Sequence, residues 1–113
     1  MDANKKIAKQ FGKFIAKSDF VAAHGLLTKG AQKRHSPDKL RKNFEQTTAY
    51  APGPVRKVEV MGDVLGDWPD KRDGDIAWVY VSLYGDDYVE AVSVTLAEET
   101  GVVRIRHLEW GRP

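Results

Sequence analysis

Residues 76–110 read IAWVYVSLYGDDYVEAVSVTLAEETGVVRIRHLEW, and this stretch decides the fold. It contains three runs rich in β-branched and aromatic residues, which are enriched in strands. Two short segments that contain glycine, 85–87 and 98–101, separate the runs. Such spacing is typical of hairpins. We therefore predict three consecutive antiparallel strands over residues 76–84, 88–97 and 102–110.

The first of these strands is apolar on both of its faces. Aromatic side chains alternate onto one face and aliphatic side chains onto the other: Trp78, Tyr80 and Tyr84 against Val79, Val81 and Leu83. A strand that is apolar on both faces needs cover on both faces. We expect helices on one face and, on the other, either a second subunit or a ligand cavity.

The first 50 residues follow a helical pattern, because apolar residues recur there at every third or fourth position. We predict a first helix over residues 3–17. A second helix begins at the cap Ser18 and ends near Gly30. The sequence SPD at 36–38 indicates a third helix start, with a capping serine, a proline in the first turn and an acid beside it.

A change of pattern follows Pro54, where the apolar period falls from about four to two. Residues 55–61 are predicted to form a further strand and residues 62–75 a long loop. Trp68 in that loop either anchors it to the body or is exposed for binding. The whole chain, residues 1–113, is thus expected to be a single α+β domain with three N-terminal helices packed on a curved antiparallel sheet of four or more strands.

The amino-acid composition excludes several classes of functional site. The chain of 113 residues has no cysteine, which excludes disulfides, zinc–thiolate sites and thiol nucleophiles. No apolar stretch is long enough to suggest a signal peptide or a membrane span, and we expect a cytoplasmic protein. Residues 1–50 have a net charge of +7 and residues 51–113 a net charge of −5. This dipolar distribution favours either an acidic partner or self-association.

Three segments carry a resemblance to a known family. They are SDFVAAHGLLT at 18–28, SPDKL at 36–40 and VRIRHL at 103–108. Together with the element order, they resemble the NTF2-like superfamily, the cystatin-like α+β cone. The resemblance implies that helices and a curved sheet enclose a cone, which serves members as enzyme pocket, ligand cavity or core. It also implies that the outer face of the sheet forms a dimer.

Three residues are candidates for a catalytic base. Glu90 has the parity of Val92 and Val94 and is expected to face inward. His107 and Glu109 share the parity of Ile105 and are expected to do the same. Residues of these types are more often solvated or structural than catalytic. The three histidines lack metal-ligand spacing, so we expect neither a metal nor a cofactor.

The aromatic residues of the sheet are the strongest binding signal, because rings give a large contact area at low entropic cost. The set comprises Trp78, Tyr80, Tyr84, Tyr88 and Trp110. Core packing explains the same pattern. A row of lysines at Lys5, Lys9, Lys13 and Lys17 lies on the first helix. Since the aromatic residues lie in the acidic half, we do not expect nucleic-acid binding.

Three functional hypotheses follow. The first is a non-enzymatic binding or interaction domain, homodimeric through the sheet, that takes a small apolar ligand or a protein partner. The second is a small pocket enzyme of the isomerase, cyclase or dehydratase kind (SnoaL-like or ketosteroid-isomerase-like), with Tyr80 or Tyr88 as proton donor. The third is an acidic-partner binder that uses the lysine row. The sequence leaves enzymatic activity undecided, although it favours the first hypothesis.

Overall fold

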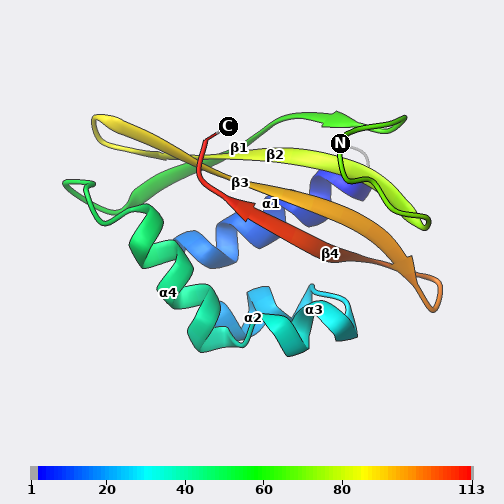
Figure 1. Cartoon of the computed structure of the whole chain (residues 1–113). Coiled ribbons are helices and arrows are strands. Elements are labelled where there is room, and N and C mark those ends of the chain that lie inside the picture. The colour runs from blue at the N-terminus through cyan, green and yellow to red at the C-terminus, as the bar shows by residue number, and fades with distance from the viewer. Residues whose placement is uncertain (1–2, 113) are drawn as a thin grey trace.

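The computed structural model describes residues 3–112, and over these residues the chain forms four helices followed by four strands (Figure 1). The helices are α1 (Ala3–Ala16), α2 (Phe20–Gly25), α3 (Lys29–Arg34) and α4 (Pro37–Thr47). The strands are β1 (Val55–Val64), β2 (Asp75–Gly85), β3 (Tyr88–Glu99) and β4 (Val102–Trp110).

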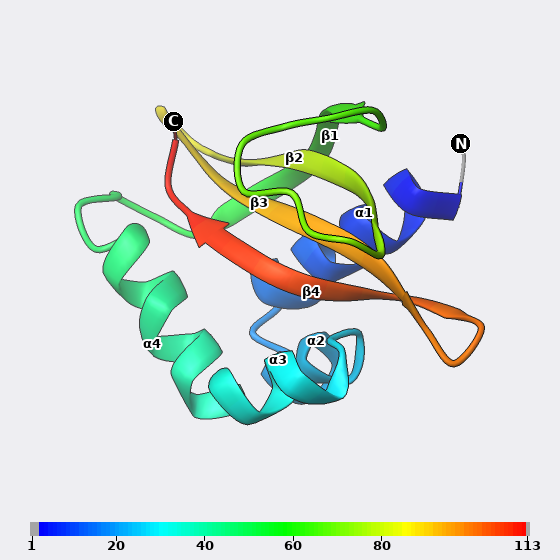
Figure 2. The ribbon, with the colours of Figure 1, turned by 45° about the vertical axis from the view of Figure 1, so that its right-hand side comes forward.

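The described strands make one antiparallel sheet in the order β1-β2-β3-β4. All helices lie on one side of this sheet, and the strands twist across them (Figures 1 and 2). Helix α1 packs against β1 and β2, while α3 and α4 contact β4. We call the helix-covered side the inner face. The other side, which carries Trp78, Tyr80 and Tyr84, is the outer face.

The predicted α+β class and the three consecutive strands after residue 75 are confirmed. The prediction of three helices is wrong, because the expected second helix is divided. Ser18 adopts a positive φ of 60°, so Asp19 caps α2 instead, and its carboxylate accepts a hydrogen bond from Ala22 N at 3.2 Å. Thr28 then caps a new helix, α3, and Gly30 lies inside it.

The core lies between the helices and the inner face. Fully buried side chains from α1, from the segments around α2 and α4, and from β2, β3 and β4 form one cluster. Its largest members are Phe11, Ile15, Leu27, Leu40, Leu83, Leu96 and Ile105. Burial of such side chains is the main stabilising contribution in a domain of this size.

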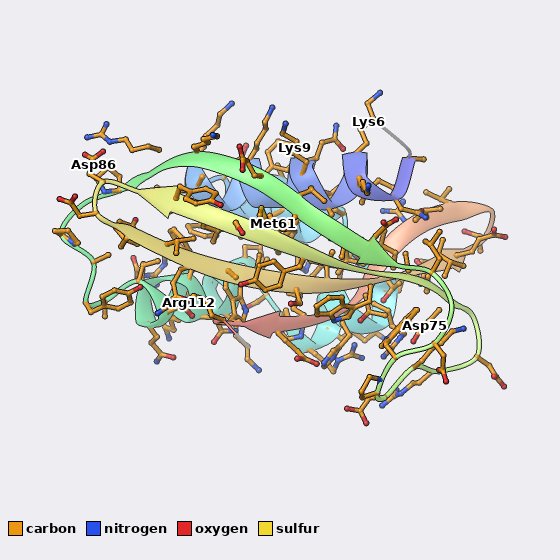
Figure 3. All side chains as sticks on the ribbon, turned by 90° about the horizontal axis from the view of Figure 1, so that it is seen from above. Lys6, Lys9, Met61, Asp75, Asp86 and Arg112 are labelled. Atoms are coloured by element: carbon orange, nitrogen blue, oxygen red, sulfur yellow. The ribbon has the colours of Figure 1, made fainter. Side chains whose placement is uncertain are left out.

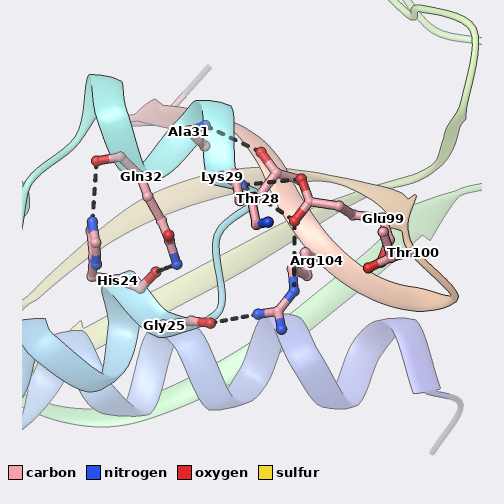
Figure 4. Close-up of polar contacts among 9 residues, drawn as sticks. All are labelled: His24, Gly25, Thr28, Lys29, Ala31, Gln32, Glu99, Thr100 and Arg104. Carbon is pink, nitrogen blue, oxygen red and sulfur yellow. Dashed lines mark hydrogen bonds and ion pairs between the residues drawn. The ribbon is translucent and has the colours of Figure 1, made fainter.

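The two edges of the sheet differ. The edge of β4 that faces away from β3 is covered, because residues 26–28 pair with it. Thr28 N donates to Ile105 O at 2.8 Å, and Ile105 N donates to Leu26 O at 2.9 Å. Arg104 adds a hydrogen bond to Gly25 O at 2.7 Å (Figure 4). β1 forms the opposite edge, and no backbone hydrogen bond from another described segment reaches its free side.

Gly12 sets how closely α1 approaches the sheet. A Cβ atom at this position would lie 2.7 Å from Val58 Cγ1 and 2.9 Å from Val81 Cγ1. Valine side chains are stiff at χ1 and cannot turn aside without strain. Glycine is therefore needed here for the close approach of a helix to a sheet.

We expect Gly12→Ala to lower the free energy of unfolding by about 1–3 kcal/mol, because overpacking outweighs alanine's better helix propensity. Urea denaturation measures the change. Gly30→Ala is the matched control, since the nearest atom to its added Cβ is the flexible end of Arg34, 3.5 Å away. This control is expected to be neutral or stabilising by up to about 1 kcal/mol. An equal increase in the free energy of unfolding in both variants would contradict the proposed role of Gly12 in packing.

Candidate functional site

The outer face carries the aromatic side chains that the sequence singled out on β2. Trp78 lies opposite Thr95, Tyr80 opposite Ser93 and Tyr84 opposite Val89. The Trp78 and Tyr80 rings are 6.3 Å apart and tilted by 40°. Their partners on β3, Thr95 and Ser93, have much smaller side chains.

Small polar residues on the outer face of β3 are buried although no helix covers them. Ser93 is only 5% exposed and Thr95 only 3% exposed. Larger neighbours on β2 and β4 flank both residues across the sheet. The side chains on this part of the outer face therefore shield Ser93 and Thr95 from water without any cover from a helix.

One end of the outer face is bordered by the loop between β1 and β2, which crosses the sheet (Figure 2). Trp68 in this loop is half-buried, and it lines a surface hollow of about 450 Å³ together with Pro69, Trp78 and Glu109. The Lys71 ammonium lies 5.2 Å from the centre of the Trp68 ring. Trp68 thus lies beside the outer face and remains partly exposed there, an arrangement that fits both expectations for this residue.

A buried ion pair anchors this loop. The Asp75 side chain is fully buried, and both of its oxygens accept hydrogen bonds from Arg106, at 2.6 and 2.7 Å. Arg72 N donates to the same carboxylate at 2.8 Å. Burial of Asp75 opposes its charge, but the Arg106 guanidinium and the Arg72 backbone outweigh it, so the pKa of Asp75 lies below its usual value.

The expectation that His107 and Glu109 point inward is wrong. A β-bulge at Arg106 shifts the register of β4, so Leu96 faces Ile105 while the adjacent Thr95 faces His107. Because a bulge adds one residue, the alternation beyond it is inverted. The two side chains therefore lie on the outer face, where His107 Nε2 is 3.5 Å from Glu109 Oε1 and both are well exposed.

Glu90 faces inward, as its parity predicted. Its side chain is only 9% exposed, and Oε2 accepts a hydrogen bond from the Tyr50 hydroxyl at 2.8 Å. This bond raises the pKa of Tyr50. Arg112 Nε lies 3.8 Å from the other oxygen, Oε1, which has no hydrogen-bond partner in the described part of the chain. The Glu90 carboxylate thus lies at the border of the core, between Tyr50 and Arg112.

The predicted aromatic set is divided between the two faces. Trp110 lies on the inner face and packs on Phe11 and Phe44, at ring distances of 6.5 and 6.3 Å. The Tyr88 ring covers Gly85, and its hydroxyl donates to Gly53 O at 2.9 Å. Both are structural residues in this arrangement. Trp78, Tyr80 and Tyr84 remain as candidates for binding.

Sequence reasoning missed Tyr50, Arg112 and the Asp75–Arg106 pair. Tyr50 follows α4 outside any regular element, and it meets Glu90 40 residues later. Asp75 and Arg106 are 31 residues apart. No local pattern marks these contacts. Nothing in the strand sequence distinguished Arg106 from its neighbours Arg104, His107 and Glu109.

Among residues 3–112, no three side chains of the metal-ligating types His, Asp and Glu converge to hold a metal ion. In the same range, none of the helices has the length and apolar character needed to cross a bilayer.

Comparisons of the chain with family models, with curated proteins and with solved structures found no match.

We expect Arg106→Met to lower the free energy of unfolding by about 3 kcal/mol at pH 7, because it leaves a buried carboxylate unpaired. The lowered pKa of Asp75 makes the ion pair fully stabilising above the unfolded-state pKa of about 3.9, and this stabilisation is lost as pH falls through the folded-state pKa. The deficit of the variant should accordingly shrink below about pH 4.

Denaturation at several pH values measures this difference. Arg104→Met is the control on the same strand, because Arg104 and its partner Glu99 are partly exposed. The control is expected to lose about 1 kcal/mol or less. A deficit for Arg106→Met that stayed constant from pH 7 to about pH 3 would contradict the assignment.

Proposed function

We propose that this chain is a non-enzymatic binding domain that pairs with a second copy of itself through the outer face of its sheet. One observation carries the proposal. The aromatic side chains Trp78, Tyr80 and Tyr84 stand half-exposed on a face that no helix covers. Half-exposed rings on such a face suit the packing of one sheet against another.

The chemistry of the face supports contact with protein. Trp and Tyr are enriched at the centres of protein interfaces, where they form most of the strong contacts. Polar groups frame the rings: Tyr84 lies beside Met61 and under Lys57, whose ammonium is 5.8 Å from the ring centre. His107 and Glu109 frame the opposite side. A ring-rich centre within a polar rim is the usual anatomy of an interface.

The alternative of a small pocket enzyme has less support. It requires a carboxylate base in a hollow core, and Glu90 is the single candidate base that faces inward. That carboxylate is already hydrogen-bonded to Tyr50, and large side chains fill the space between helices and sheet. The membership in the NTF2-like superfamily stays a proposal as well, supported by helices on one face of a twisted antiparallel sheet. A cytoplasmic location is supported by the cysteine-free composition.

The dimer predicts a mass of two chains in static light scattering. Trp78→Ala should weaken self-association at least about tenfold, the effect expected when an interface hot spot is truncated. Val21→Ala is the matched control, because Val21 is 73% exposed and lies on α2, away from the sheet. Glu90→Gln, on the inner face, should leave the mass unchanged.

A monomer at a concentration of several hundred micromolar, roughly the weak end of specific self-association, would remove the proposal. So would a dimer that Trp78→Ala and Val21→Ala weaken to the same extent. Tyr80→Lys serves as a second variant, because it places a charge at the centre of the pairing face without changing the core.

A further inference from the structure

A basic groove runs between α1 and the free edge of β1. Lys9, Lys13 and Lys17 line it from α1 and the turn that follows, and Arg56 and Lys57 line it from β1. The Lys57 ammonium itself lies over Tyr84 on the outer face. Apolar residues line its floor: Ala16, Val55 and Val58. The groove encloses about 550 Å³. In Figure 3, α1 extends beyond the edge of β1, and Lys6 and Lys9 project from it away from the sheet.

The positive charge in this groove is only partly compensated by carboxylates. Five cationic side chains line it with one carboxylate, Glu59, which pairs with Lys57 at 2.7 Å. Arg56 also has a partner outside the groove, Asp86, at 3.5 Å. Within residues 3–112, no carboxylate lies in ion-pair range of Lys9, Lys13 or Lys17. Like charges four residues apart destabilise a helix slightly, so α1 gains nothing from the row by itself.

The spacing of the lysines matches an extended chain. Residues four apart on a helix are about 6 Å apart along its axis. Alternate residues of a strand point to one side and recur every 6.6–6.8 Å, roughly. Acidic side chains at every second position of an extended segment would therefore meet Lys9, Lys13 and Lys17 in turn.

The backbone of β1 supplies the second half of the site. The opposite edge of the sheet is closed by residues 26–28, whereas the free side of β1 accepts no backbone hydrogen bond from the described chain. Between its two register irregularities, β1 has a regular run at residues 57–60. Such an edge can pair with an added strand, and the flanking cations repel a basic one.

We infer that the groove between α1 and β1 binds an extended acidic segment of a partner protein. The segment adds as a short strand beside residues 57–60, and its alternate carboxylates contact the lysines of α1. Three observations favour a peptide over a nucleic acid. The groove offers unpaired backbone groups, its lining contains no aromatic ring for base stacking, and its floor is apolar.

The test uses a fluorescent peptide of about eight residues with alternating Glu and Thr, long enough to cover three lysines. Fluorescence anisotropy measures binding to the full chain. We expect micromolar affinity that falls steeply with salt. A peptide of the same composition with its glutamates contiguous should bind at least about threefold more weakly, because it cannot place carboxylates at alternate positions.

Lys13→Glu combined with Lys17→Glu should weaken binding at least about tenfold, or about 1.4 kcal/mol. Lys33→Glu combined with Lys39→Glu is the matched control, since it makes the same change of charge at exposed positions of α3 and α4. Hydrogen exchange gives a readout that charge alone would not move, because strand addition must slow exchange of β1 amides at residues 57–60.

Any of the following results would overturn the inference. The first is the absence of binding at a peptide concentration of about 1 mM. The second is an equal loss of affinity in both double variants, or unchanged exchange of the β1 amides in a complex that does form. The third is tighter binding of an oligothymidine of equal charge that depends on Lys13 and Lys17. Trp78→Ala, which tests the dimer, should leave peptide binding unchanged, so the two proposals fail separately.

Discussion

The central strand β2 carries large apolar and aromatic side chains on both of its faces, yet helices cover only one of these faces. Helix α1 approaches the inner face so closely that Gly12 has no room for a side chain. Every other helix follows on the same side. The aromatic side chains of β2 are consequently left on a face that no helix covers, and the proposed pairing surface exists because of this one-sided helical cover.

The two edges of the sheet differ in how their polar backbone groups are satisfied. At β4, backbone pairing with residues 26–28 and the hydrogen bond from Arg104 to Gly25 satisfy groups that an edge strand would otherwise expose. Lys29 N also donates to Glu99 at the β3–β4 turn, which holds α3 against the sheet (Figure 4). At β1 no such cover exists, and positive charge lines the opening. The sheet thus presents one closed edge and one open edge.

Buried polar groups in the sheet are used as anchors. The Asp75–Arg106 pair joins the start of β2 to the bulge of β4 and so fixes the end of the long loop. The Glu90–Tyr50 hydrogen bond joins β3 to the segment after α4. In both cases a charged group in a low-dielectric site is stable only with its partner in place. These contacts hold connecting segments against the sheet, and this is a structural role.

The sequence by itself determined the α+β class, the meander after residue 75 and the inward direction of Glu90, because alternation along a strand is a local property. It also separated Trp78, Tyr80 and Tyr84 from the aliphatic side of their strand. Only the tertiary structure decided the direction of His107 and Glu109, since both lie beyond the bulge at Arg106, whose side chain pairs with Asp75 on another strand. The same holds for the burial of Trp110 and for the open edge of β1. Each depends on residues far apart in the chain, and a local pattern does not encode which of them meet.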